Sequence, residues 1–133
     1  MKAPIIVDER GNLMIFESVK DAEVSLEAVD VRNNEYIAFD SEGRLLRLIP
    51  ISTHEVSIEH AEAEPSHAQE LQAKLVSFLA RVEEPETWLK AASLPELIAK
   101  ALEYKEEMDL SFHLPLVPSL RSFVRRWLSR GTS

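Results

Sequence analysis

The chain has 133 residues, of which 45% are hydrophobic, and its formal net charge is −8. This apolar content suffices for one core, so we expect a single domain spanning residues 1–133. The negative charge opposes attraction to nucleic acid and anionic lipid, and it favours a basic protein partner instead. Because cysteine is absent, the chain can have neither disulfides nor cysteine-based nucleophiles or metal sites.

No targeting or membrane segment is predicted. The N-terminus has only three consecutive large aliphatic residues, from Ile5 to Val7, before a charge, unlike the core of a secretion signal. The most apolar internal stretch, residues 45–51, contains Arg47 and Pro50 and is far shorter than the roughly 20 residues of a membrane span. We therefore expect a cytoplasmic chain with no membrane span.

The first half of the chain has the pattern of short strands around one helix. Apolar runs at 4–8 and 13–17 flank Glu9-Arg10-Gly11-Asn12, which suits a hairpin because Gly11 or Asn12 can adopt positive φ. Ser18, followed three residues later by Asp21, is typical of a helix start, and the apolar spacing that follows predicts a helix over 19–28.

A second hairpin and a further strand follow. Asn33-Asn34 indicates a turn, and the segments 35–40 and 45–49 flank a second turn at residues 41–44. Residues 53–59 alternate, with Val56 and Ile58 on one side, so we expect a half-buried strand there. The order ββαβββ predicts an α+β fold with a mostly antiparallel five-stranded sheet.

From residue 66 the apolar period changes from two to 3.6, which predicts a C-terminal group of three to four helices. Ser66 with Gln69 resembles a capping box before the longest apolar stripe. Pro85 suits the first turn of a short helix, and Ser93 with Glu96 suits the cap of the next one.

The end of the chain is predicted to form an extended arm and a basic helix. We expect an arm over 108–118 because of its two prolines. The arm has five large apolar residues, which pack either on the preceding helices or on a second copy of the chain as a homodimer contact; they are Leu110, Phe112, Leu114, Leu116 and Val117. A helix over 119–130 follows, and residues 113–133 carry four arginines and no acid.

The basic helix allows two interpretations. Arg121, Arg125, Arg126 and Arg130 pair with the acidic body while the apolar side completes the core. Alternatively, they contact phosphates as part of a peripheral membrane or nucleic-acid adaptor.

No catalytic motif is recognised, so we expect a protein that is not an enzyme and needs no cofactor or metal. The three glycines, Gly11, Gly43 and Gly131, cannot form a phosphate-binding loop or a dinucleotide motif. The four histidines do not show the spacing that places two metal ligands on one helical face. An enzyme that uses His54, His60 and neighbouring glutamates stays open as an alternative.

The strongest candidate for a binding site is an acidic cluster consisting of Glu55, Glu59, Glu62 and Glu64. These residues fall on an expected strand and the loop that follows it. They form either a solvated surface or a docking surface for a basic protein, because opposite charges speed encounter and exclude wrong partners.

Residues in the first third of the chain also carry a resemblance. The segments Asp8-Glu9-Arg10-Gly11-Asn12-Leu13, Phe16-Glu17-Ser18, Asp30-Val31 and 35–43 resemble a pattern in small, uncharacterised proteobacterial proteins. Some of those proteins are similar to cytoplasmic immunity proteins of secreted antibacterial toxins. The resemblance implies an intracellular protein-binding domain that inhibits a basic toxin or another protein partner.

Overall fold

The computed structural model describes residues 1–82 and 84–112. The chain divides into two compact units, Met1–Lys74 and Leu75–Ser133, and each is described here by itself. The expectation of one domain over 1–133 stays a prediction.

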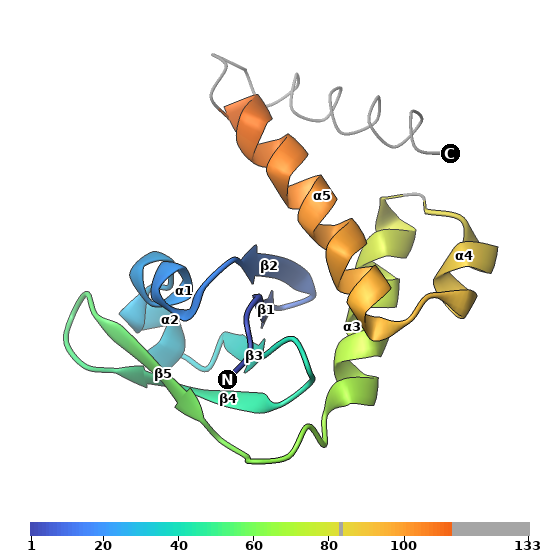
Figure 1. Ribbon diagram of the computed structural model, residues 1–133. Coiled ribbons are helices and arrows are strands. Elements are labelled where there is room, and N and C mark those ends of the chain that lie inside the picture. The colour runs from blue at the N-terminus through green and yellow to red at the C-terminus, as the bar shows by residue number, and fades with distance from the viewer. Residues whose placement is uncertain (83, 113–133) are drawn as a thin grey trace. The chain divides into compact units, whose positions relative to one another are not determined.

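The first unit is built on a five-stranded sheet with the order β2-β1-β3-β4-β5, in which every neighbouring pair is antiparallel (Figure 1). This architecture confirms the predicted α+β class and the antiparallel sheet. The strands are β1 (Ile5–Glu9), β2 (Asn12–Phe16), β3 (Tyr36–Phe39), β4 (Leu45–Pro50) and β5 (Val56–His60).

The first hairpin forms where the sequence predicts it. Glu9 pairs with Asn12, so the connection has only two residues, Arg10 and Gly11. Both have positive φ, 52° and 93° respectively, as a type I′ turn requires. Gly11 therefore has the predicted conformation, whereas Arg10, rather than Asn12, provides the second positive φ.

Two short helices, and not one, connect β2 to β3. The predicted helix over 19–28 is α1 (Val19–Ser25), which ends at Ser25, and a separate α2 (Ala28–Arg32) follows. The Ser18 side chain accepts a hydrogen bond from Asp21 N, which confirms the predicted cap. Leu26 and Glu27 are extended between the helices, and the break lets both Leu26 and Ala28 enter the core, each 2% exposed.

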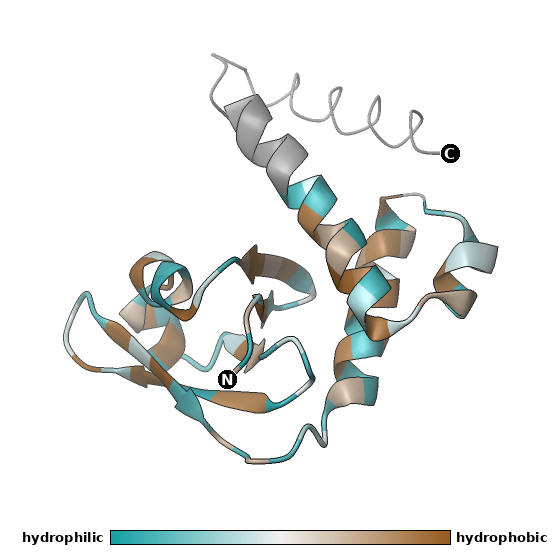
Figure 2. Cartoon of the chain, viewed as in Figure 1, coloured by the Kyte–Doolittle hydropathy of each residue, from teal (hydrophilic) through white to brown (hydrophobic). Residues whose placement is uncertain are grey.

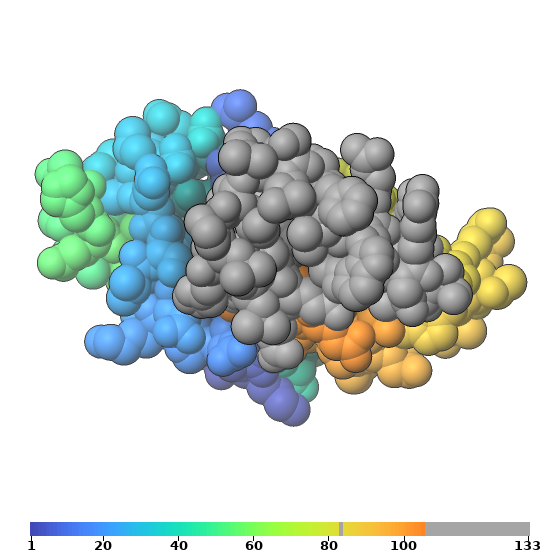
Figure 3. All heavy atoms as spheres, turned by 90° about the horizontal axis from the view of Figure 1, so that it is seen from above, coloured from blue at the N-terminus to red at the C-terminus, as the bar shows by residue number. Residues whose placement is uncertain are grey.

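The helices cover one face of the sheet, where alternate strand residues form the core of this unit. Ile5 and Val7 of β1 lie in this core with Val56 and Ile58 of β5, and hydrophobic and hydrophilic residues alternate along β5 (Figure 2). The Arg32 guanidinium donates to Ser52 O, and in the space-filling view the helical segment adjoins the β4–β5 hairpin (Figure 3). The core of the unit thus lies between one helical layer and one sheet face.

The turn between β3 and β4 is organised by the fully buried Asp40. Its Oδ1 accepts hydrogen bonds from the main-chain N–H groups of Glu42 and Arg44, and its Oδ2 accepts from Lys2 N and the Arg44 guanidinium. Burial opposes ionisation of this carboxyl, but these hydrogen bonds outweigh it and hold its pKa below the ordinary value. Sequence analysis treats Asp40 only as the end of a strand.

The strand predicted at 53–59 begins three residues late. Residues 52–54 form the tip of the β4–β5 hairpin, where Ile51 N donates to Glu55 O. His54 therefore lies in the loop and not in the strand predicted over 53–59. Pro50 is the last residue of the preceding strand.

Among residues 75–82 and 84–112 of the second unit the structure describes the end of α3 (Ala68–Arg81), which begins in the first unit, and all of α4 (Glu86–Ala91) and α5 (Leu94–Phe112). Ser93 and Glu96 form the predicted capping box, because Glu96 N donates to Ser93 Oγ and Ser93 N donates to Glu96 Oε1. Ser66 behaves differently, since its hydroxyl donates to Glu62 and α3 starts at Ala68. The Tyr104 hydroxyl donates to the buried Glu84.

The predicted arm over 108–118 is wrong in its first five residues, which lie within α5. No proline precedes Pro115 in this segment, so nothing interrupts the helical hydrogen bonds as far as Phe112. The rest of the arm and the predicted helix over 119–130 lie outside the described residues. Among the helices that the structure describes, none is long and apolar enough to cross a membrane.

Gly43 lies where the turn meets the start of α3. Its φ is +92°, and a Cβ at this position would lie 2.3 Å from the main-chain Cα of Ala68. A Gly43→Ala substitution should lower the free energy of unfolding by about 2 kcal/mol or more, through backbone strain and overlap with the helix. Urea unfolding of the full chain measures this change. Ser41→Ala in the same turn is the control, and an equal loss in both variants would contradict the prediction.

Candidate functional site

The four candidate carboxylates occupy two kinds of environment. Glu55, in the β4–β5 loop, and Glu59, on β5, are exposed, as is Glu64 in the connection to α3. Within the described part of the chain these three side chains make no hydrogen bond or ion pair. Glu62 is half-buried and belongs to an internal network.

The Glu62 carboxylate connects β4 to the segment that enters α3. Its Oε1 accepts a hydrogen bond from Leu45 N and lies 2.7 Å from His67 Nδ1, and its Oε2 accepts from the Ser66 hydroxyl. The hydrogen bonds from Ser66 and Leu45, with a smaller effect of His67, lower the pKa of Glu62 from 4.5 to about 2. Both oxygens are engaged internally, so the geometry assigns Glu62 a structural role.

The sheet face opposite α1 and α2 is open to solvent along β4 and β5. Register and alternation place Arg47 opposite Glu59 and Ile49 opposite Ser57 on this face. The Ile51 N to Glu55 O hydrogen bond continues the ladder and sets Ile51 opposite Glu55. We call the following seven residues the open face: Ile37, Arg47, Ile49, Ile51, Glu55, Ser57 and Glu59.

The open face combines apolar and acidic side chains. Ile37 is 42% exposed and Ile51 is 62% exposed, and they are two of the five large exposed hydrophobic residues found in the described part of the chain. Glu55 and Glu59 are exposed on the same face, and the exposed Arg47 lies opposite Glu59 in the register. An apolar centre next to charged residues is the usual anatomy of a protein–protein interface.

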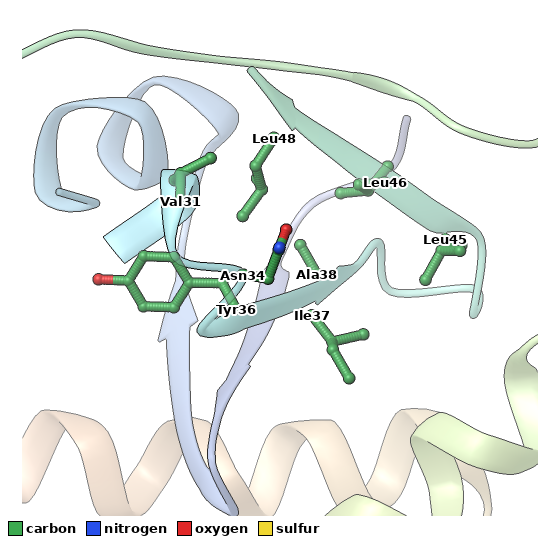
Figure 4. A pocket seen from close by; sticks show the side chains of 8 residues that line it. All are labelled: Val31, Asn34, Tyr36, Ile37, Ala38, Leu45, Leu46 and Leu48. Atoms are coloured by element: carbon green, nitrogen blue, oxygen red, sulfur yellow. The ribbon is translucent and has the colours of Figure 1, made fainter. Parts of the chain in front are cut away.

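A pocket opens beside this face, where β3 and β4 separate. Their ladder has only two residue pairs, Ala38 with Leu46 and Phe39 with Leu45. Beyond them the strands diverge and leave a cavity of about 280 Å³ (Figure 4). Its lining consists of Val31, Asn34, Tyr36, Ile37, Ala38, Leu45, Leu46 and Leu48. Ile37 belongs to both the pocket and the open face.

A second acidic group lies around Tyr36. Carboxylate oxygens of Glu9, Asp30 and Glu35 lie within 4.8 Å of one another, close enough to share a cation. Two of these carboxylates already have partners, since Tyr36 donates its hydroxyl to Asp30 and Arg10 pairs with Glu35. Burial, followed by the effect of Asp30, raises the pKa of Tyr36 to about 12. The contacts with Tyr36 and Arg10 therefore account for the positions of Asp30 and Glu35 without a bound ion.

The structure does not bring His54 and His60 together. Both are exposed, His54 in the hairpin loop and His60 at the far end of β5. His67 contacts Glu62 instead. His113 and the four C-terminal arginines lie outside the described residues. The two histidines predicted as a possible site thus lie apart, at opposite ends of β5.

Sequence analysis missed the apolar part of the open face. The sequence indicates Glu55 and Glu59 but not Ile37, Ile49 and Ile51, because an apolar residue in a predicted strand does not by itself show which face of the sheet is covered. The available signal was that β4 has apolar residues on both faces, with Arg47 as the one charge, while β5 carries a charge on one face. In an antiparallel sheet one face commonly packs on the core and the other stays in contact with solvent, so apolar residues on the second face are open to a partner.

The negative charge is also unevenly distributed. Met1–Lys74 contains fifteen acidic and seven basic residues, so it carries the whole net charge of −8, whereas Leu75–Ser133 has eight of each. The first unit alone is therefore attractive to basic molecules. Comparison of the chain with models of protein families, with curated proteins and with solved structures gives no match.

The Glu62 network predicts a dependence of stability on pH. Because the pKa of Glu62 is lower in the folded than in the unfolded chain, its ionised form stabilises the fold fully above pH 4.5. This stabilisation is lost as the pH falls from 4.5 towards about 2. The wild-type chain should therefore unfold at higher urea than Glu62→Gln at neutral pH, and the difference should shrink on acidification. Glu64→Gln is the control, and a difference independent of pH would contradict this role of Glu62.

Proposed function

We propose that the chain is a protein-binding protein whose first unit binds a basic partner through the open face. The observation that carries this proposal is the placement of the exposed Ile37 and Ile51 on the same sheet face as Glu55 and Glu59. Apolar side chains provide binding energy when a partner excludes water from them. The carboxylates at the rim select a positively charged partner and speed its approach.

The charge distribution supports the same function. A partner with a basic surface is attracted to Met1–Lys74, which holds all of the surplus acid. Within this unit many carboxylates are engaged, since Asp8 pairs with Lys74 and Asp40 holds a turn. Glu55, Glu59 and Glu64 are exposed carboxylates free to meet external cations, and the register places the first two on the open face.

The biological role that we propose is inhibition. A small acidic protein that covers the basic active site of a toxin protects the cell that makes both. The resemblance of the N-terminal third to immunity-type proteins agrees with this role. If it is correct, the neighbouring gene encodes a basic toxin, and the purified chain forms a tight complex with that product in the cytoplasm.

The charge prediction uses two double variants with the same change in net charge. Glu55→Lys with Glu59→Lys should weaken binding to the neighbouring gene's product by about tenfold or more. Asp21→Lys with Glu27→Lys alters exposed carboxylates on the helical segments and should leave affinity within about threefold. Calorimetry measures binding, and growth on toxin expression measures protection. Equal losses in both variants would show that total charge, and not the open face, determines binding.

The apolar prediction also has a matched control. Ile37→Ser with Ile51→Ser should reduce affinity by about tenfold, because both side chains become buried in the complex. Val24→Ser with Val29→Ser removes two hydrophobic residues of similar or greater exposure from the helical layer, and it should leave the complex intact. Thermal unfolding checks that both variants fold. Full binding by the isoleucine variant would place the interface elsewhere.

A further inference from the structure

The two edges of the sheet differ in how they are protected. In β5 the hydrogen bonds from Ile51 N to Glu55 O and from Ala61 N to Leu45 O show that odd-numbered residues face β4. The main-chain groups of Ile58 therefore point away from the sheet. The Glu23 carboxylate accepts the outward Ile58 N–H at 2.8 Å. A carboxylate at the centre of this edge discourages a further strand from pairing.

The β2 edge has a different pattern. In a type I′ hairpin the residues that flank the turn, here Glu9 and Asn12, exchange two hydrogen bonds. Bonded and non-bonded pairs alternate from there, so Met14 bonds to Val7 while the N–H and C=O groups of Leu13 and Ile15 point outward. Within residues 1–82 and 84–112 these outward groups have no hydrogen-bond partner.

The side chains of β2 do nothing to exclude a second strand. The sequence Asn-Leu-Met-Ile-Phe contains neither a charge nor a proline, the two common protections of an edge. Leu13, Met14 and Phe16 are only partly buried, although they are apolar. A paired strand would cover this apolar surface as well as satisfy the main-chain groups.

We propose that β2 pairs antiparallel with β2 of a second copy of this chain, about a two-fold axis at Met14. In this register Leu13 lies opposite Ile15 of the second copy, and Ile15 lies opposite its Leu13. The outward groups of both strands then form four main-chain hydrogen bonds, because two residues spaced symmetrically about the axis satisfy each other. The two sheets become continuous across the dimer.

Charge complementarity favours a second copy over an unrelated strand. The same register sets Glu17 opposite position 11 of the second copy, next to its Arg10. Arg10 pairs with Glu35 of its own copy, but its side chain stays 75% exposed, and Glu17 is also exposed. Two opposite-charge contacts thus form, one at each end of the paired strands, and the register aligns no like charges. This dimer is independent of the proposed function and uses a different part of the sheet.

The test measures the mass of the full chain by light scattering and analytical ultracentrifugation over a range of concentrations. The wild-type chain should form a dimer. Leu13→Pro removes an outward N–H but no hydrogen bond to β1, so it should give a folded monomer with an unchanged circular dichroism spectrum. Leu13→Lys places a charge on the edge and should also give a monomer, and Leu13→Val should remain a dimer.

A charge exchange tests the register itself. Arg10→Glu and Glu17→Arg should each weaken the dimer by about threefold to tenfold, and the double variant should recover most of the loss. A wild-type chain that stays monomeric at every concentration overturns the proposal. A dimer that survives both Leu13→Pro and Leu13→Lys also overturns it and directs attention to other surfaces, such as residues 110–117. Neither result depends on the basic partner, so the proposed function is tested separately.

Discussion

The buried carboxylate of Asp40 is the interaction on which the first unit most depends. It accepts main-chain hydrogen bonds from Lys2, Glu42 and Arg44, and it thereby fixes both the N-terminal segment and the turn between β3 and β4. The same turn carries Gly43, whose carbonyl accepts from His67 N at the start of α3. Because an ionised carboxylate is costly to bury without donors, this turn has little conformational freedom.

Two further contacts of charged side chains stabilise the strands next to this turn. Glu62 bonds to Leu45 N next to the turn, and Lys74 reaches from α3 to Asp8 on β1 at 2.6 Å. The β3–β4 end near the turn is therefore tightly constrained, whereas the other end opens into the pocket. The open face starts at this less constrained end, with Ile37. The constrained turn thus positions the strands that carry the open face, and the side chains of this face stay accessible to a partner.

Sequence reasoning recovers the parts of the fold that local patterns determine. Alternating apolar residues and the Gly11 turn predict the strands, and Ser93 with Glu96 predicts the start of α5. The break after Ser25 was not predictable, because the apolar spacing continues from α1 into α2 and only packing decides between one helix and two. Asp40 and Glu62 were missed as structural residues for a similar reason. Their long-range partners, Lys2 and Leu45, are distant in sequence, so local patterns could reveal at most the turn contacts of Asp40 and the Ser66 contact of Glu62.

The short ladder between β3 and β4 divides the sheet into two parts, and few hydrogen bonds connect them. Five residue pairs join β1 to β2, four join β1 to β3, and five join β4 to β5. Only two residue pairs join β3 to β4. Local opening follows the boundary with the fewest hydrogen bonds. The β4–β5 hairpin is also held through the helical layer, however, because Arg32 donates to Ser52 O and Glu23 accepts from Ile58 N. The position of the hairpin, and with it the curvature of the open face, thus depends on α1 and α2 as well as on the strand ladder.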